Sequence, residues 1–201
     1  MEYSTLDKLG VRVSRLGFGC MRFPLTAEGK IDEPRAAAML DTAYKAGVTY
    51  YDTAYFYHQH TGEAFLGRAM KRYPRDTFYL ATKMPMSIVE SLDHAKEIFE
   101  GQLAALQTDY VDFYLLHGVN GERWKQAQEM GIADFLLEMQ KAGRIRHFGF
   151  SFHGSYEEFE TILTARDWDF CQIQFNYMDQ EIQAGMRGLS LIHISEPTRR
   201  S

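Results

Sequence analysis

Short apolar runs alternate along the chain with longer segments in which apolar residues recur three or four positions apart. The short runs are rich in aromatic and β-branched residues, which is typical of buried strands. Six of them lie near 16–19, 48–53, 78–83, 111–117, 145–152 and 170–175. The segments between them have the spacing of amphipathic helices. This alternation, with short connections, predicts a parallel sheet whose strands are joined by crossover helices.

Polar residues at the segment ends predict where the helices begin. Pro34 is favourable in the first turn of a helix that starts at Glu33, and Thr61 is the candidate N-cap of the next helix. Residues 87–90 and 155–158 both have the Ser-x-x-Glu form of a capping box, which predicts a helix after each.

Two further segments have weaker patterns. Residues 3–15 alternate between apolar and polar positions around Leu9-Gly10, which predicts a short hairpin. Residues 118–133 are polar and irregular, so we expect a loop there with at most a short helical turn at 124–129.

Titratable side chains occur where three consecutive strands end. Asp52 ends the second strand and Tyr57 follows five residues later, while Lys83 and His117 end the next two strands. The carboxyl ends of parallel strands meet at one edge of the sheet, and chemistry collects there. Taken singly, an ion pair, a packed tyrosine or a core histidine would explain each residue. Their common placement at strand ends favours one shared site.

The sequence around these residues resembles that of the aldo-keto reductase family. Asp52-Thr53-Ala54, followed by Tyr57, has the form of the family's Asp-Thr-Ala-x-x-Tyr signature, and Leu115-Leu116-His117 is similar to its Leu-Leu-His strand end. The resemblance extends from about Leu16 to about Gly188. It implies an α/β fold, the (β/α)8 TIM barrel, which has eight strands and typically ~250 residues. We therefore expect an incomplete barrel of about six of the eight βα units, preceded by the hairpin.

The resemblance also implies a chemistry, the NAD(P)H-dependent reduction of an aldehyde or ketone to an alcohol. Tyr57 would be the general acid that protonates the carbonyl oxygen. The Lys83 ammonium would stabilise the tyrosine anion that is left, and Asp52 would hold Lys83 in place. His117 would orient the carbonyl of the substrate.

Residues that contact the cofactor in the family correspond to Met21, Arg22, Asp52, Ser151 and Gln172. Ordinary hydrogen bonding at strand ends would explain Ser151 and Gln172 equally well. The family's usual asparagine after the serine is Phe152 here. In the family, the basic residues that determine the preference for NADP or NAD follow the seventh and eighth strands. Those strands are not among the six expected here, so the sequence does not decide between NADP and NAD. The segments 150–154 and 172–177 resemble a branch of the family that often carries a ferredoxin-like C-terminal extension in the full-length protein.

Composition narrows the class of partner. The formal net charge of -5 argues against a nucleic-acid-binding surface, and no apolar run approaches the ~18 residues of a membrane span. Cys20 and Cys171 are too few for a disulfide framework and lack metal-ligand spacing, which fits a reducing cytoplasm. The partner that the family resemblance implies is a small carbonyl compound.

The last residues, 189–201, resemble the translation of a sequencing adapter. We expect an artefactual tail that packs against nothing specific, so that residues 1–188 form the one domain, a partial barrel. The parent protein would continue with the two missing βα units, and the fragment alone would be inactive.

Two other functions remain open. One is a metal-dependent barrel hydrolase with His58, His60 and His117 as ligands beside Asp52, although Lys83 would place a positive charge near the metal. The other is a non-catalytic relative that uses the barrel as a binding or regulatory subunit.

Overall fold

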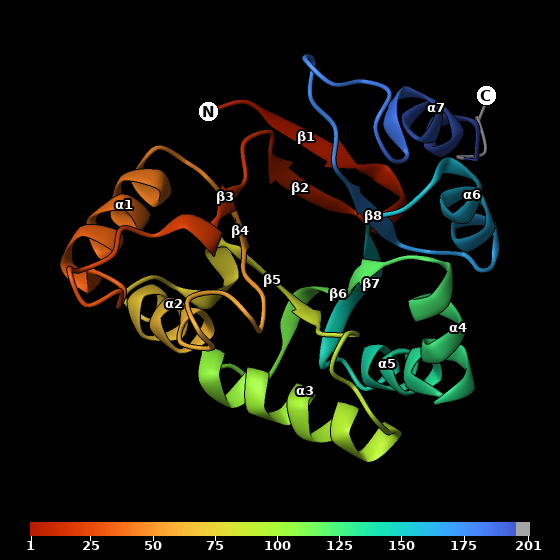
Figure 1. The fold of residues 1–201 in the computed structure, drawn as a ribbon. Coiled ribbons are helices and arrows are strands. Elements are labelled where there is room, and N and C mark those ends of the chain that lie inside the picture. The colour runs from red at the N-terminus through yellow and green to blue at the C-terminus, as the bar shows by residue number, and fades with distance from the viewer. Residues whose placement is uncertain (196–201) are drawn as a thin grey trace.

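The structure is a computed structural model that describes residues 1–195, and its centre is a curled parallel sheet (Figure 1). The sheet has six strands in the order β3-β4-β5-β6-β7-β8, and each strand pairs in parallel with the one before it. The strands are Phe18–Gly19, Tyr50–Asp52, Tyr79–Met84, Val111–Val119, Ile145–Phe152 and Phe170–Ile173. All six predicted strands are confirmed, and their order is that of an incomplete (β/α)8 barrel.

Helices cover the outer side of this sheet (Figure 1). They are α1 (Glu33–Lys45), α2 (Gly62–Met70), α3 (Leu92–Leu106), α4 (Gly121–Glu129), α5 (Ile132–Lys141), α6 (Tyr156–Thr164) and α7 (Gly185–Ser195). Short 3-10 turns are found at Asp7–Leu9, Cys20–Arg22 and Arg75–Thr77. The main core lies between the sheet and the helices and contains Phe99, Leu116, Phe150 and Phe159, each fully or almost fully buried.

The N-terminal hairpin is confirmed and forms its own two-stranded sheet. Strand β1 (Tyr3–Leu6) pairs antiparallel with β2 (Val11–Ser14). Leu9, Val11 and Val13 pack against a second, smaller cluster of buried residues, Ala81, Phe113 and Leu115. The hairpin therefore covers side chains of β5 and β6 that do not belong to the main core.

The helix starts predicted at Glu33, after Thr61 and at Ser155 are confirmed, and the start predicted at 87–90 is wrong. Helix α3 begins after Ser91, whose hydroxyl accepts from His94 N at 3.1 Å, and the predicted box at 87–90 is a loop because Val89 is buried in the core. Thr61 occupies the N-cap position of α2 as predicted, but its hydroxyl makes no capping hydrogen bond and donates to the His58 carbonyl at 2.6 Å. The capping box at Ser155 is present as predicted.

The predicted loop at 118–133 contains helix α4 and the first residues of α5. Asn120 caps α4 by accepting from Arg123 N at 3.0 Å, and Trp124 and Ala127 turn one face of the helix into the core. Most of its other residues are polar, which hid this narrow apolar face in the sequence. Helix α5 begins right after it, at Ile132.

Helix α7 crosses the predicted boundary at Gly188. Leu191 is partly buried against the main core, so the expectation that the tail packs against nothing is wrong at this residue. Residues 196–201 of the predicted tail lie outside the described part of the chain, and the domain boundary stays a prediction.

The opposite end of the sheet, where the strands begin, has a buried ionic cluster. The Asp112 carboxylate is 1% exposed and lies 2.6 Å from Arg75 and 3.1 Å from Arg146. It also accepts from Leu80 N at 2.9 Å. Both guanidinium groups lie over the Tyr110 ring, at 4.1 and 4.3 Å from its centre. We call these four residues, Arg75, Tyr110, Asp112 and Arg146, the arginine clasp.

No helix within residues 1–195 has both the length and the apolar character that crossing a bilayer requires.

Candidate active site

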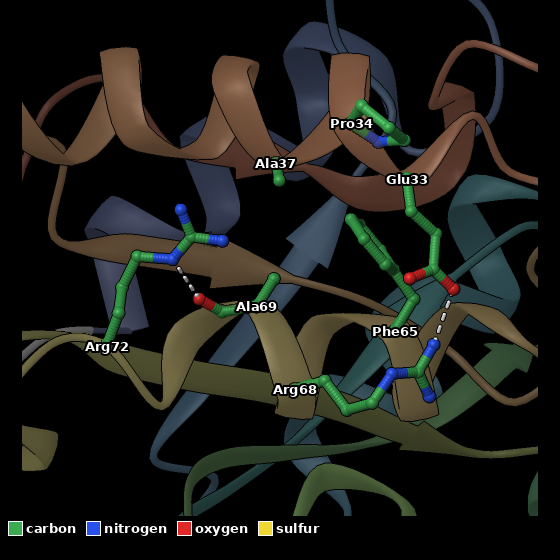
Figure 2. A pocket seen from close by; sticks show the side chains of 7 residues that line it. All are labelled: Glu33, Pro34, Ala37, Phe65, Arg68, Ala69 and Arg72. Atoms are coloured by element: carbon green, nitrogen blue, oxygen red, sulfur yellow. Dashed lines mark hydrogen bonds and ion pairs between the residues drawn. The ribbon is translucent and has the colours of Figure 1, made fainter.

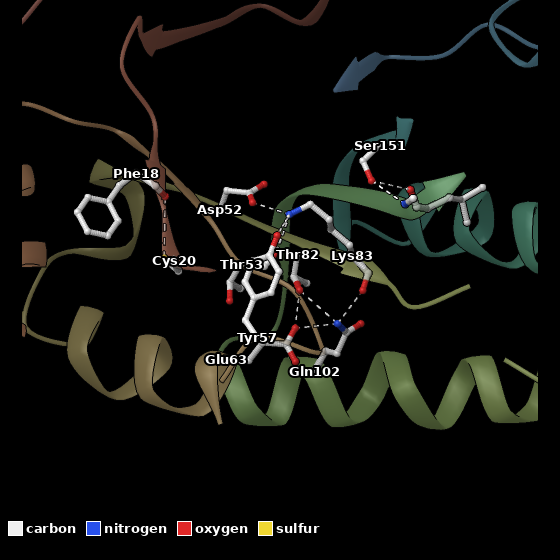
Figure 3. A network of polar contacts seen from close by, with 12 residues as sticks. Phe18, Cys20, Asp52, Thr53, Tyr57, Glu63, Thr82, Lys83, Gln102 and Ser151 are labelled. Carbon is white, nitrogen blue, oxygen red and sulfur yellow. Dashed lines mark hydrogen bonds and ion pairs between the residues drawn. The ribbon is translucent and has the colours of Figure 1, made fainter. Parts of the chain in front are cut away.

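Lys83 stands at the centre of the candidate site, near the end of β5 (Figure 3). Its ammonium donates to Asp52 Oδ1 at 2.5 Å and to the Thr53 carbonyl at 2.9 Å. Lys83 is only 2% exposed and Asp52 9% exposed, so the two charges are removed from water together. A buried charge is tolerated when it is paired and hydrogen-bonded. The pair is possible because β4 and β5 are parallel neighbours whose carboxyl ends lie side by side.

Tyr57 completes this group from the loop after β4. Its hydroxyl lies 3.5 Å from Lys83 Nζ, and that nitrogen is 5.2 Å from the centre of the tyrosine ring. The loop folds back through a hydrogen bond from Gly62 N to the Tyr57 carbonyl. The next three residues, 58–60, have the left-handed φ values 53°, 54° and 67°. This turn fixes the direction of the tyrosine toward Lys83.

His117 lies near Tyr57, toward the end of β6. The two ring centres are 6.3 Å apart. Burial, and then the charge of Lys83, lower the pKa of His117 to about 4. The imidazole is therefore neutral at pH 7. The structure thus brings together all four side chains that the sequence singled out.

The predicted cofactor contacts are spread around this edge of the sheet. Met21 and Arg22 are exposed in the turn after β3, and Gln172 is exposed on β8, directly beside Ser151 in the register of β7 and β8. Ser151 is buried, and its hydroxyl accepts from Gly118 N at 2.8 Å. This contact is an ordinary hydrogen bond between strand ends, which is the alternative to cofactor binding that the sequence also allowed for Ser151.

A pocket of about 350 Å³ opens beside the tyrosine. It is lined by Met21, Phe56, Tyr57, His58, His117 and His153. Sequence reasoning did not assign Phe56 or His153 to the site. The position of His153 just after the end of β7 was the signal that could have found it, because the site lies at strand ends.

Buried polar atoms at this edge are available to a ligand. Among the described residues, Asp52 Oδ2, Thr53 Oγ1 and His117 Nδ1 have no hydrogen-bond partner in the protein. Such atoms are costly to bury unless something binds them. Together with the pocket, they fit a polar group that enters between the strand ends, as the amide of a nicotinamide or a carbonyl substrate would.

Two of the three histidines of the metal hypothesis have other contacts. His58 Nε2 lies 2.9 Å from the Cys20 carbonyl oxygen and 3.3 Å from Phe23 N, and the His60 ring packs against Tyr55 at 4.6 Å between centres. Across residues 1–195, no three His, Cys, Asp or Glu side chains are grouped so that they could hold a metal ion.

A larger hollow of about 420 Å³ lies between α1 and α2, on the outer side of the barrel (Figure 2). Its arginines are already engaged. Arg68 pairs with Glu33 at 2.6 Å, and Arg72 Nε donates to the Ala69 carbonyl at 2.8 Å. It contains none of the four clustered side chains, so we assign the chemistry to the smaller pocket.

The fold and the site define an α/β protein with an incomplete parallel barrel, whose buried Asp-Lys pair and tyrosine lie at the carboxyl ends of the strands. The model of the aldo/keto reductase family matches residues 15–189. The chain belongs to this family, which is a family of oxidoreductases.

Individual relatives agree with this assignment. The aldo-keto reductase YhdN of Bacillus subtilis (strain 168) is 30% identical over 193 residues, which cover 91% of this chain and 56% of that protein. Probable aldo-keto reductase 1 of Glycine max is 28% identical over 73% of this chain and 43% of its own length. Among solved structures, the holo form of the aldo-keto reductase AKR11C1 from Bacillus halodurans superposes with a TM-score of 0.78 at 30% identity, covering 96% of this chain and 63% of that one. The chain therefore spans about half the length of the curated relatives it matches.

Proposed function

We propose that the protein reduces an aldehyde or ketone to an alcohol with NADPH or NADH. The observation that carries this proposal is the position of the Lys83 ammonium, 2.5 Å from the Asp52 carboxylate and 3.5 Å from the Tyr57 hydroxyl. Because the chain spans about half the length of its relatives, the activity is proposed for the whole protein, and the 201-residue chain alone is expected to be inactive.

Tyr57 is the proton donor in this proposal. Its hydroxyl borders the pocket and can give its proton to a carbonyl oxygen held there. An ammonium beside a phenol stabilises the anion formed when the proton leaves. Asp52 keeps the Lys83 ammonium directed at the tyrosine, since the buried ammonium is bound to its carboxylate.

His117 orients the substrate. Because its pKa is lowered to about 4, the ring is neutral at pH 7 and has one nitrogen that donates and one that accepts. A neutral donor can hold the carbonyl oxygen without adding a second positive charge beside Lys83.

Met21, Arg22, Asp52, Ser151 and Gln172 would hold the nicotinamide cofactor at the edge of the sheet. When bound, the cofactor supplies the hydride, which no side chain can deliver. Support comes from the register that sets Ser151 beside Gln172 and from the polar atoms that are free at Asp52 and Thr53. The two free cysteines support a reducing, cytoplasmic location.

The test is Tyr57→Phe in the whole protein. The ring stays and only the proton donor is removed, so carbonyl reduction should fall about 10²- to 10⁴-fold while cofactor binding is kept. The readouts are consumption of reduced nicotinamide with a simple aldehyde and cofactor binding by fluorescence. Tyr55→Phe is the matched control, because this residue lies two positions away on the same loop and does not line the pocket. Unchanged turnover in Tyr57→Phe contradicts the proposal, and a wild type that reduces no carbonyl would favour the non-catalytic subunit.

A further inference from the structure

A second group of buried polar side chains lies behind Lys83, on the helix side of the sheet (Figure 3). Its members are Glu63 on α2, Thr82 on β5, Gln102 on α3 and Tyr114 on β6. They are 5%, 0%, 1% and 0% exposed. Nothing in the proposed mechanism uses them, yet polar groups buried this deeply are costly unless their hydrogen bonds are made.

Gln102 is the centre of this group. Its amide nitrogen donates to the Lys83 carbonyl at 3.0 Å and to Glu63 Oε1 at 2.7 Å. Its amide oxygen accepts from the Tyr114 hydroxyl at 2.5 Å. Both hydrogens of the amide have acceptors and the oxygen has a donor, so the side chain is held in one orientation.

Glu63 anchors the other side. The same oxygen, Oε1, accepts from the Thr82 hydroxyl and from Gln102. Burial raises the pKa of Glu63, while the hydrogen bonds from Thr82 and Gln102 and the charge of Lys83 act in the opposite direction. The carboxyl group is thus bound to the strand at Thr82 and, through Gln102, at Lys83.

Close packing of two helices makes this arrangement possible. Gly67 lies one turn after Glu63 on α2, and a Cβ there would lie 2.6 Å from the backbone of Ala105 and Leu106 on α3. The absence of a side chain lets α2 approach α3 closely enough for Glu63 to meet Gln102.

We propose that Glu63 and Gln102 are positioning residues that clamp the end of β5, so that the Lys83 ammonium stays between Asp52 and Tyr57. This inference rests on the proposed function. Side chains alternate between the two faces of a strand, so Thr82 meets the clamp while Lys83 points into the site. A lysine side chain is long and flexible, and its ammonium is placed only as well as the backbone that carries it. Displacement of a catalytic group by about 1 Å costs as much as 10²-fold in rate.

Gln102→Leu in the whole protein tests the clamp, because leucine has a similar volume and cannot donate to the Lys83 carbonyl. We expect kcat to fall about 10- to 100-fold with little change in KM, and the pH profile of kcat to shift. Tyr114→Phe removes one outer hydroxyl and should act in the same direction more weakly, which keeps the test valid if Gln102→Leu does not fold.

Two substitutions of Glu63 separate hydrogen bonding from charge. Glu63→Gln keeps an oxygen that accepts from Thr82 and Gln102 and should retain most of the activity. Glu63→Leu should behave like Gln102→Leu. Equal losses in both Glu63 variants would overturn the clamp, since charge rather than positioning would then explain them.

Lysine labelling gives a readout that does not depend on turnover. A small amine-reactive reagent should modify Lys83 slowly in the wild type, because the side chain is only 2% exposed there. In Gln102→Leu the modification, mapped by mass spectrometry, should be at least about 10-fold faster. Asp112→Asn is the matched control, because this equally buried carboxylate lies at the opposite end of the sheet. It should lower stability and leave Lys83 labelling unchanged.

The two proposals can fail separately. If the wild type reduces no carbonyl, the proposed function fails and the labelling still decides the clamp. Unchanged labelling in Gln102→Leu, or equal acceleration in Asp112→Asn, overturns the clamp whatever the activity.

Discussion

Burial changes the acid–base behaviour of His117 more than its sequence position suggests. The ring is enclosed at the end of β6, and the Lys83 ammonium adds a like charge nearby. Both effects disfavour the protonated form. His117 is therefore neutral over the whole physiological range.

This shift makes stability depend on pH. The folded protein binds a proton at His117 only below about pH 4, whereas an unfolded histidine does so below ~6.5. Between these values unfolding takes up a proton, so stability is complete above ~6.5 and is lost as the pH falls. We expect a loss of about 2 kcal/mol from this residue between pH 7.5 and 5.

Urea unfolding at the two pH values measures the effect, with His117→Gln as the comparison. The variant lacks this titration and should lose correspondingly less stability on acidification. His147, whose pKa burial also lowers, contributes in both proteins and cancels. An identical pH dependence in the two proteins would contradict the assignment.

The sequence predicted Asp52, Tyr57, Lys83 and His117 because strand ends are easy to locate and the residues there are chemically distinctive. It did not predict the partnership of Glu63 with Gln102. Those residues lie on two different helices, and Gln102 in particular resembles an ordinary helix-surface residue in the sequence. Only the crossing of α2 and α3 shows that both point inward.

At the scale of helices, the contact between α2 and α3 depends on one missing side chain. Alanine is a better helix former than glycine by as much as ~1 kcal/mol. At Gly67, however, a methyl group would lie 2.6 Å from the backbone of Ala105 and Leu106, so the two helices would have to separate.

Gly67→Ala should therefore destabilise the protein by about 1–3 kcal/mol. Gly101→Ala on α3 is the control, since a Cβ there meets nothing within 4 Å and helix propensity alone should stabilise the protein by about 0.5–1 kcal/mol. Chemical denaturation of both variants gives the comparison. Equal effects of the two substitutions would show that α2 does not depend on this close approach.

Helix boundaries were predictable where local chemistry decides them and not where the core does. The box at Ser155 forms because its first turn is solvent-exposed and free to close on itself. The Ser-x-x-Glu sequence at 87–90 does not start a helix, because the burial of Val89 stabilises the fold more than an earlier helix cap would. Tertiary packing delays the helix until Ser91.

At the scale of the whole molecule, the sheet has two open edges, formed by β3 and β8. Within the described residues, β3 pairs only with β4 and β8 only with β7, so both edge strands offer unpaired backbone groups. Beyond β8, Phe175, Tyr177 and Met178 are exposed. Phe18 on β3 and Ile173 on β8 are only partly buried against the core. Open edges with apolar neighbours are templates for association.

We therefore expect the 201-residue chain to form oligomers or aggregates. Size-exclusion chromatography measures the size of the species that this chain forms. A protein of the full length of the relatives is the control, and it should elute as a single defined species. A sharp monomer peak with cooperative melting for the 201-residue chain would show that the edges are protected in another way.

The arginine clasp has a consequence for the order of events during synthesis. Asp112 receives its two arginines from opposite directions along the chain, Arg75 from before it and Arg146 from after it. When Asp112 emerges from the ribosome, Arg75 has already emerged and Arg146 has not. The carboxylate has no complete set of partners until β7 has followed. The middle of the sheet is thus expected to settle late and as one unit, after a nascent chain of about three quarters of this length has already emerged.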